Sequence, residues 1–378
     1  MGPRILMILS NGFTHDPRVS AEAASLARVG FDVTVLAWDR KGVLPQEERL
    51  RGIRIVRVRN TFGMRLRPYE LFRLRPFWRL ASRRAMELHR QTAFSAVHCH
   101  DLDTLPVGVW MKRRTGVRLL YDAHEFFPLM IGELSRAKPF EGRFASLERR
   151  LVPEADVVLV ASPTQQSYFQ GMARGPIVTI MNSRPLSYDS YQPPNNARMT
   201  VVYIGGLQTN RLLVPFAELA VEDGSFDAEI GGWGPAAEPI RALAAQGRGN
   251  LRFLGVVPID EVVPRTRAAD VVYSLLDPSK RVFRLAAPNK LFEALVTGRP
   301  ILVTQGTWAA DEVVAADCGL AIEYSTEALR AAIRALIADP AARERMGRNA
   351  FRLAQDRYNW SNDEASLLAA YANLGLAA

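Results

Sequence analysis

Short apolar runs alternate along the chain with segments whose apolar positions recur every three or four residues. The first pattern is typical of buried strands, and the second of helices that bury one face. Regular alternation of the two favours parallel sheets with helical crossovers, so we predict an α/β protein. The predicted strands are residues 4–10, 32–38, 53–59, 96–101, 118–125, 155–162 and 176–182 in the first half, and residues 200–206, 227–234, 251–257, 269–276 and 300–304 in the second.

A break in this alternation near the middle of the chain predicts two domains. Residues 183–198, SRPLSYDSYQPPNNAR, are rich in Pro, Ser and Asn, which is typical of a linker. A chain of 378 residues is also too long for one ordinary hydrophobic core. We predict one domain over residues 1–185, a second over residues 198–355, and a final helix over residues 356–378 that crosses back to the first domain.

The stretch APNKLFEALVTGRPILV, residues 287–303, contains a charge in an apolar setting. Pro288 and Gly298 stand where helices favour Pro at the start and Gly after the end. The helix between them is apolar on most faces, which indicates burial, yet it carries Glu293. Because an unpaired buried carboxylate is costly, Glu293 should face a partner or a cavity.

Polar residues and glycines follow several of the predicted strands. Two α/β domains joined by a linker form a cleft, and ligands in such domains bind at the carboxyl ends of the strands. We therefore expect a ligand site to include some of these residues. They are Asn11 and Gly12, His100 and Asp101, His124 and Glu125, and Gly205 and Gly206.

Positive charge is concentrated in one stretch of the first half. Residues 1–190 hold 29 Lys and Arg against 18 Asp and Glu, whereas the remainder holds 19 against 21. Residues 49–84 contain 12 arginines and a single acidic residue, Glu70, interleaved with aromatic residues and leucines. This mixture suits an anionic membrane surface, an acidic acceptor, a nucleic acid, or an ordinary solvated helix face. We favour membrane binding through residues 65–84 and expect no nucleic-acid partner.

The composition is that of a globular protein, with 48% hydrophobic and 23% charged residues, which excludes a disordered chain. No run approaches the ~18 apolar residues that a membrane-spanning helix needs, and the first residues lack the basic leader and cleavage site of a signal peptide. Cys99 and Cys318 stand far apart in apolar contexts, as expected for buried thiols in a cytosolic protein. We predict a cytoplasmic protein that associates peripherally with the inner face of the cell membrane.

The order of these segments resembles that of an enzyme family, the GT-B glycosyltransferases of the retaining family 4 type (glycosyl transferases group 1), which assemble bacterial polysaccharides and glycolipids. Four matches carry the resemblance, and together they span nearly the whole chain. They are THDPRVSAEAASLARVGFDVTVLAWD, VHCHDLDTLP with LLYDAHEFFP, VVYIGGL followed by Arg211, and APNKLFEALVTGRPILV.

The resemblance implies two Rossmann-like domains that face each other across a cleft. It also implies transfer of a sugar from a nucleotide-diphosphate sugar to an acceptor, which we expect to be a lipid-linked glycan or polysaccharide precursor. The implied catalytic residues are His124, Asp101, Arg211 and Lys290. The implied donor-binding residues are Gly12, Gly205, Gly206, Arg211, Gly232, Trp233, Gly234, Val256, Val257, Pro288, Asn289, Lys290, Leu291 and Glu293, although a packing role for Trp233 stays equally open. On the acceptor side, we expect His15 and Arg18 to be candidates for binding an anionic acceptor, together with His100.

The implied chemistry is electrostatic. Glu293 would accept hydrogen bonds from two ribose hydroxyls, as a carboxylate can. Arg211, Lys290 and the helix N-terminus would offset the charge of the leaving nucleotide diphosphate, with no metal and no other cofactor. His124 would contact the transferred sugar. Asp-Leu-Asp at residues 101–103 admits a metal site or a strand-end cap, and we favour the cap.

Two positions depart from the family pattern. Leu285 stands where a second Glu is usual, and Gly206 stands where an Arg is usual, with Arg211 in the place of a Lys. Other classes therefore stay open. A nucleotide-sugar 2-epimerase would share the architecture without using an acceptor, and an inactive family member would fit Leu285. A hinged solute-binding protein would need an export signal, and we find none.

Overall fold

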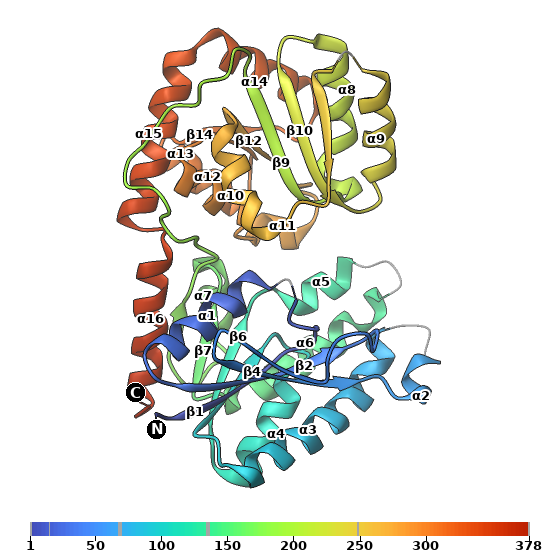
Figure 1. Ribbon diagram of the computed structural model, residues 1–378, viewed down its shortest axis with the longest axis vertical. Helices are drawn as coiled ribbons and strands as arrows, with labels where there is room; N and C mark the ends of the chain where they lie inside the picture. The colour runs from blue at the N-terminus through green and yellow to red at the C-terminus, as the bar shows by residue number, and fades with distance from the viewer. Residues whose placement is uncertain (1, 15, 67–69, 134–136, 248, 377–378) are drawn as a thin grey trace. The chain divides into compact units, whose positions relative to one another are not determined.

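The alternating strands and helices form two sheets, each in its own unit of the chain (Figure 1). The computed structural model describes residues 2–14, 16–66, 70–133, 137–247 and 249–376. Contacts divide the chain into unit 1, Met1–Met181 with Asp363–Ala378, and unit 2, Asn182–Asn362. The segment predicted as a linker, residues 183–198, is therefore grouped with unit 2.

Unit 1 contains, among its described residues, a sheet of eight strands in the order β3-β4-β2-β1-β5-β6-β7-β8. Neighbouring strands are parallel except β3 and β4, which are antiparallel. The strands are β1 (Arg4–Ile8), β2 (Asp32–Asp39), β3 (Glu47–Leu50), β4 (Ile53–Arg59), β5 (Ala96–His100), β6 (Arg118–Ala123), β7 (Val157–Val160) and β8 (Ile177–Thr179).

The described part of unit 2 contains a parallel sheet of six strands in the order β11-β10-β9-β12-β13-β14. The strands are β9 (Thr200–Gly206), β10 (Asp227–Trp233), β11 (Leu251–Gly255), β12 (Val271–Ser274), β13 (Ile301–Thr304) and β14 (Gly319–Ile322). Each unit has its own core of buried apolar side chains. The predicted α/β class with two parallel-sheet domains is confirmed.

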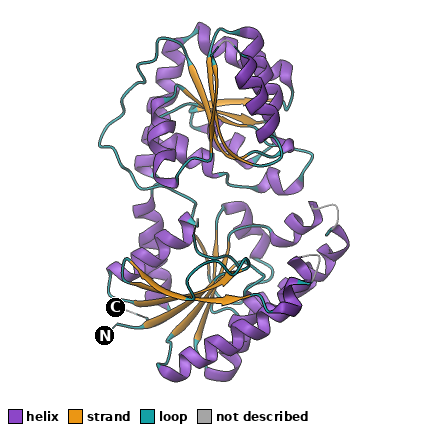
Figure 2. Ribbon diagram, turned by 45° about the vertical axis from the view of Figure 1, so that its right-hand side comes forward, coloured by secondary structure: helices purple, strands orange, loops and turns teal. Residues whose placement is uncertain are grey.

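Helices connect the strands and pack on the faces of each sheet (Figure 2). In unit 1 they are α1 (Pro17–Arg28), α2 (Phe62–Arg65), α3 (Leu74–Gln91), α4 (Leu105–Thr115), α5 (Phe127–Glu133), α6 (Glu141–Leu151) and α7 (Pro163–Phe169), with 3₁₀ turns at Glu70–Arg73, Lys138–Phe140 and Val152–Glu154. In unit 2 they are α8 (Leu213–Asp223), α9 (Ala237–Gln246), α10 (Ile259–Ala268), α11 (Arg281–Leu285), α12 (Asn289–Thr297), α13 (Trp308–Ala315), α14 (Thr326–Ala338) and α15 (Pro340–Asp356), with a 3₁₀ turn at Thr209–Arg211. The last helix is α16 (Trp360–Asn373).

The helix signals read from the sequence lie where helices begin and end. Asp16 caps α1 by accepting a hydrogen bond from the N–H of Val19 at 3.2 Å. Pro288 directly precedes α12, and Gly298 follows it with a φ of 65°. This left-handed conformation favours glycine, which explains why the apolar helix stops there.

Two strands, β3 and β14, were not predicted. All four residues of β3 are exposed, so this strand has no apolar run. The two middle residues of β14 are only half-buried. Both strands lie at the edge of their sheet, where backbone hydrogen bonds to one neighbour suffice. The pattern of apolar and polar side chains does not reflect such backbone bonds, so neither strand could be predicted from it.

The C-terminal part of α16 belongs to unit 1 from Asp363 onward. Asp363 accepts a hydrogen bond from the N–H of Met181 at 3.0 Å. The hydroxyl oxygen of Tyr371 lies 2.9 Å from Nδ1 of His98 on β5. The C-terminal helix thus completes a buried polar region of unit 1.

In each sheet the strand order reverses beside the first strand of the unit. β1 lies between β2 and β5, and β9 lies between β10 and β12. Ligands of open α/β sheets bind outside the carboxyl ends of the strands at such a point. In unit 1 this edge carries His100 at the end of β5, and in unit 2 it carries Gly205 and Gly206 at the end of β9.

Candidate functional site

Asp122 is the centre of a polar cluster at the carboxyl ends of β5 and β6 in unit 1. Its Oδ2 lies 2.7 Å from Nε2 of His124 and 3.2 Å from Nδ1 of His100. Arg18, from α1, donates to Oδ2 through Nε at 3.0 Å and to Oδ1 through Nη2 at 2.6 Å. Burial alone would raise the pKa of Asp122, but Arg18 and His124 hold it well below its ordinary value. Asp122 is therefore a carboxylate at neutral pH.

Arg18 is buried, and its guanidinium is engaged within unit 1. Besides Asp122, its Nη1 donates to the carbonyl oxygen of Ile180 at 2.5 Å. The sequence-based hypothesis gave Arg18 an anionic acceptor, whereas its partner in the fold is a carboxylate of the same unit. Arg18 therefore orients Asp122, and through it His124.

His124 lies on the outer side of the cluster, with 15% of its side chain exposed. Burial lowers the pKa of the imidazole, but the carboxylates of Asp122 and Asp101 raise it further, to about 10. At neutral pH the ring is an imidazolium, so it can donate a charged hydrogen bond but cannot act as a general base. Such a donor suits an oxygen atom that gains negative charge.

Asp101 supports His124 from the loop after β5. Its Oδ1 accepts a hydrogen bond from the backbone N–H of His124 at 3.1 Å, and its Oδ2 lies 3.7 Å from Nδ1 of the ring. Burial raises the pKa of the Asp101 carboxyl to about 7, although His124 lowers it. Its backbone φ of 65° is left-handed, a conformation that Asp tolerates better than most residues. Asp101 thus caps the strand end and positions the histidine.

The inner side of the cluster is closed to solvent and offers ligands to a cation. Glu22, His98, His100 and Asp122 each present one ligand atom, and these atoms lie within 4.8 Å of one another. The guanidinium of Arg18 already supplies positive charge there, 3.1 Å from Glu22. Burial raises the pKa of Glu22 well above its ordinary value, although Arg18 lowers it. The metal-free scheme stays a prediction.

We expect the stability of the protein to decline between about pH 6.5 and 10 in a way that depends on His124. The folded-state pKa of His124 is raised from 6.5 to about 10, so its protonation stabilises the fold fully below pH 6.5, and this contribution is lost as the pH rises through about 10. The melting temperature of His124→Gln should therefore fall less than that of the wild type as the pH rises across this window. Thermal unfolding at a series of pH values measures the difference.

A matched control for this experiment is His89→Gln. His89 lies on α3, and burial lowers the pKa of its ring, so it does not titrate in the alkaline window. This variant should follow the wild-type pH profile. Parallel profiles for wild type and His124→Gln would contradict the imidazolium assignment.

In unit 2, the predicted glycines allow neighbouring backbone atoms and the side chain of Lys290 to lie close to them. A Cβ on Gly232, whose φ is 137°, would lie 1.8 Å from the carbonyl oxygen of Gly205. A Cβ on Gly234 would lie 2.5 Å from a carbonyl oxygen of the loop after β9. A Cβ on Gly205 would lie 3.3 Å from Cε of Lys290, whereas Gly206 adjoins open space. These glycines make room at the carboxyl ends of β9 and β10.

The carboxylate of Glu293 is 2% exposed and has two cationic partners. Its Oε1 accepts a hydrogen bond from Nη2 of Arg184 at 2.9 Å, and its Oε2 accepts one from Nζ of Lys290, one turn earlier in α12. Burial lowers the pKa of Lys290, although Glu293 raises it. Arg184 was not predicted as a site residue, because it lies 109 residues before Glu293 and no local pattern connects them.

The surroundings of Glu293 carry more positive than negative charge. Arg184 and Arg211 both repel the ammonium of Lys290 and so lower its pKa, after the larger effect of burial. The hydroxyl of Tyr273 donates to the carbonyl oxygen of Arg211 at 2.6 Å and holds that turn in place. The N-terminus of α12 begins beside them at Asn289, with the free N–H groups and positive dipole of a helix start. This combination suits a phosphate group.

The other predicted residues of unit 2 differ in exposure. Trp233 is 67% exposed and Val256 is 71% exposed, so neither side chain packs into the core of its unit. Val257 lies beside β10, where its Cγ2 would be 2.8 Å from a Cβ on Gly231. The side chain of Leu291 is fully buried, and its contact with the donor stays a prediction.

Two of the remaining predicted residues of unit 1, Gly12 and His100, have neighbours within the protein. A Cβ on Gly12 would lie 2.7 Å from Cδ1 of Leu44, so a side chain of the protein occupies the space beside this glycine. His100 is buried against Asp122 instead of facing an acceptor. His15 lies outside the described residues.

Family models match both units of the chain. A model described as "Glycosyl transferase 4-like domain" matches residues 15–183, and one described as "Glycosyl transferases group 1" matches residues 198–339. No curated protein sequence matches the chain.

Several solved structures share its fold over nearly their whole length. Sucrose-phosphate synthase from Thermosynechococcus elongatus is 18% identical, with a TM-score of 0.81 and coverage of 100% of both chains. HepE from Anabaena, in complex with UDP-glucose, is 14% identical, with a TM-score of 0.71 and coverage of 98% of this chain and 99% of HepE. WaaG, a glycosyltransferase involved in lipopolysaccharide biosynthesis, is 17% identical, with a TM-score of 0.69 and coverage of 96% of this chain and 98% of WaaG. Two glycosyltransferase family models match successive parts of the chain, and the fold is that of the solved structures above. The chain therefore belongs to the group 1 glycosyltransferases of the GT-B fold.

Proposed function

We propose that the protein is a retaining, metal-independent glycosyltransferase that moves a sugar from a nucleotide-diphosphate sugar to a lipid-linked glycan or polysaccharide precursor. The observation that carries the proposal is a group of three cations at the start of α12: Arg184 and Lys290, which bind Glu293, and Arg211, which lies near Lys290. The binding of UDP-glucose by HepE, which has the same fold, supports a nucleotide-sugar donor.

In this proposal the donor diphosphate binds at the N-terminus of α12, against Lys290 and Arg211. These charges offset the negative charge that grows on the leaving nucleotide, which lowers the barrier without a metal. Glu293 accepts hydrogen bonds from the ribose and shares its oxygens with Arg184 and Lys290. The exposed Trp233 and Val256 border the base.

On the acceptor side, we assign His124 to a contact with the transferred sugar. Its imidazolium, held by Asp122 and Asp101, donates to a sugar oxygen. Arg18 and His100 act behind it as positioning residues, because both are buried against Asp122.

The donor half of the proposal is tested with a panel of UDP-, GDP-, ADP- and dTDP-sugars. We expect one nucleotide to raise the melting temperature and its sugar to be hydrolysed slowly without an acceptor. The anomeric configuration of the product, read by NMR, decides between retention and inversion. An epimerised free sugar would indicate the epimerase alternative, and the absence of any thermal shift would contradict nucleotide binding altogether.

We further propose that the protein works in the cytoplasm, on an anionic membrane surface that residues 65–84 contact. Among the described residues, no helix is both long enough and apolar enough to cross a bilayer. Apolar side chains next to the arginines are exposed, with Phe62 at 79%, Leu66 at 68% and Phe72 at 40%. Phe77, also read from the sequence as part of this surface, belongs to the core instead, where it stacks on Trp38 at 4.4 Å. Residues 67–69 lie outside the described part of the chain.

Vesicle flotation tests the membrane contact. Wild-type protein should float with anionic vesicles and not with neutral ones, and the attachment should weaken as salt rises. The variant with Arg73, Arg75, Arg79 and Arg83 changed to Ser should stay at the bottom, because each basic residue near an anionic surface contributes roughly 1 kcal/mol. If the wild type ignores anionic vesicles yet glycosylates a soluble acceptor fully, the membrane contact is wrong.

A further inference from the structure

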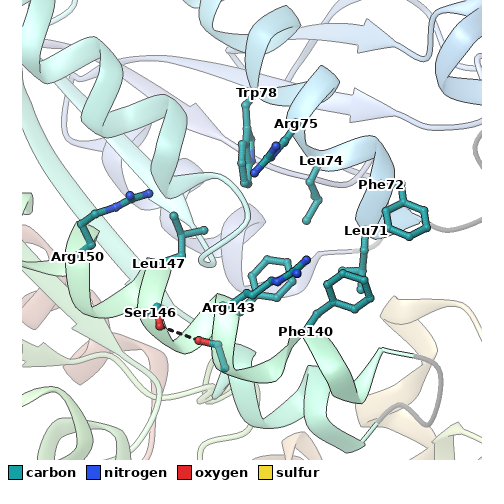
Figure 3. Close-up of a pocket in the computed structure, with 12 residues that line it drawn as sticks. Leu71, Phe72, Leu74, Arg75, Trp78, Phe140, Arg143, Ser146, Leu147 and Arg150 are labelled. Atoms are coloured by element: carbon teal, nitrogen blue, oxygen red, sulfur yellow. Dashed lines mark hydrogen bonds between the residues drawn. The ribbon is translucent and has the colours of Figure 1, made fainter.

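An open pocket of about 670 Å³ lies between α3 and α6 in unit 1 (Figure 3). Its size falls within the range of small-molecule sites, about 300–1,000 Å³. In the chain, α3 follows β4 by way of α2 and a 3₁₀ turn, and α6 follows β6 by way of α5 and a second 3₁₀ turn. The donor chemistry proposed for unit 2 does not use this pocket.

The walls of the pocket are apolar. Leu74 and Trp78 line it from α3, and Leu147 lines it from α6 (Figure 3). Phe72 and Phe140 meet edge to face at 5.8 Å and line the same pocket. Such walls gain free energy when an apolar group displaces water from them.

Three arginines surround these apolar walls. Arg75 comes from α3, and Arg143 and Arg150 come from α6 (Figure 3). All three side chains are exposed, and within the described part of the chain none of them forms an ion pair with a carboxylate. Arg84, on the next turns of α3, does pair with Glu87. The rim of the pocket therefore has uncompensated positive charge over an apolar floor.

The pocket is connected to the cluster around His124. The indole N–H of Trp78 donates to the carbonyl oxygen of Asp103 at 2.6 Å, in the loop that also holds Asp101. On the other side, Phe144 of α6 contacts Phe127 of α5, with ring centroids 5.3 Å apart. A molecule seated in the pocket thus touches residues that adjoin the loops of the candidate acceptor side.

We propose that this pocket binds the alkyl or isoprenoid chain of a lipid phosphate, with the phosphate held by Arg75, Arg143 and Arg150. An apolar floor fits the chain, and guanidinium groups without a carboxylate partner among the described residues fit the phosphate oxygens. A nucleic-acid base fits less well, because base edges need polar partners and the hydroxyl of Ser146 already donates to the carbonyl oxygen of Gly142 at 2.8 Å. The inference rests on the proposed function and names its acceptor class, a lipid-linked phosphate whose chain is anchored beside the site.

The test uses dodecyl phosphate with a terminal bromine, below its micelle concentration, as a quencher of tryptophan fluorescence. The chain has six tryptophans, and Trp78 lines the pocket. We expect saturable quenching in the full-length protein, strongly reduced in Trp78→Phe. Leu147→Gln, which places an amide in the apolar wall, should weaken binding while the protein still floats with anionic vesicles.

The charge requirement is tested by changing Arg75, Arg143 and Arg150 to Ser, which should weaken binding at least about tenfold. The matched control changes Arg49, Arg51 and Arg174 to Ser, three exposed arginines of unit 1 outside the pocket, and should bind as the wild type does. Uncharged bromododecanol should quench far less than the phosphate, and inorganic phosphate should not compete.

Equal quenching by the alcohol, equal binding by both triple variants, or displacement by an RNA oligonucleotide would overturn the lipid-phosphate site. Nucleotide-induced thermal shifts are measured on the same samples to separate the two proposals. If nucleotides bind and the alkyl phosphate does not, the pocket inference fails and the transferase proposal stands. If the alkyl phosphate binds and no nucleotide does, the transferase proposal fails and the pocket stands.

Discussion

His124→Ala should lower the turnover of sugar transfer by roughly 100- to 1,000-fold, the usual cost of removing a donor that stabilises developing charge. Donor affinity should change by less than about threefold, because the proposed contact matters at the reacting sugar and not at the nucleotide. The physical basis is the imidazolium of His124, whose pKa of about 10 keeps it charged at neutral pH after Asp122 and Asp101 outweigh the effect of burial. Steady-state kinetics and nucleotide titration measure the two quantities.

The fold should survive this change, since Asp122 keeps its two hydrogen bonds from Arg18. His89→Ala, the loss of a histidine on α3 away from the cluster, is the control and should keep its turnover. If His124→Ala turns over within about tenfold of the wild type but melts much earlier, His124 is a structural residue and its proposed contact with the sugar is wrong.

Glu293→Gln should weaken the binding of the preferred nucleoside diphosphate by about 1–3 kcal/mol, the range for losing a charged hydrogen-bond partner. A glutamine amide keeps one acceptor oxygen, so it cannot accept from two ribose hydroxyls while Arg184 and Lys290 also need partners. Isothermal titration calorimetry with UDP, GDP and ADP measures the loss.

Inorganic pyrophosphate separates the ribose contact from the charge of the site. Removing the negative charge of Glu293 leaves Arg184, Arg211 and Lys290 unopposed, so pyrophosphate should bind the variant as tightly as the wild type or more tightly. Glu312→Gln, a partly buried glutamate of unit 2 that accepts from Tyr358 at 2.5 Å, is the control. Unchanged nucleotide affinity would mean that the proposed contact between Glu293 and the ribose is wrong. An equal loss of affinity for pyrophosphate would mean that the variant disturbs the whole site.

The local features of the fold were predictable from the sequence. Apolar runs identify the central strands, because a strand buried on both faces needs apolar side chains at every position. The cap at Asp16 and the stop at Gly298 are readable because each is decided by the backbone preferences of one residue. The glycines of β9 and β10 were also predictable from the sequence, since a Cβ at Gly232 would collide with the strand beside it. The family resemblance added the order of these parts.

The site was predictable only in part. The sequence indicated that Glu293 needs a partner, because burial of a lone carboxylate is costly. It did not indicate that the partner is Arg184, and it assigned Arg18 to an acceptor instead of to Asp122. The side chain of Leu291, another predicted donor-binding residue, is buried in the core, and its contact with the donor stays a prediction.

By itself, the sequence determined which segments become strands and helices, that the chain forms two α/β units, and that charges in apolar surroundings must be paired. Only the tertiary structure decided which residues meet. Asp122 and Arg18 are 104 residues apart, and Glu293 and Arg184 are 109 apart. The tertiary structure also brought the arginines of α3 and α6 around one apolar pocket. Periodicity and capping act over a few residues, whereas these contacts depend on the order of strands in each sheet and on the packing of helices against it.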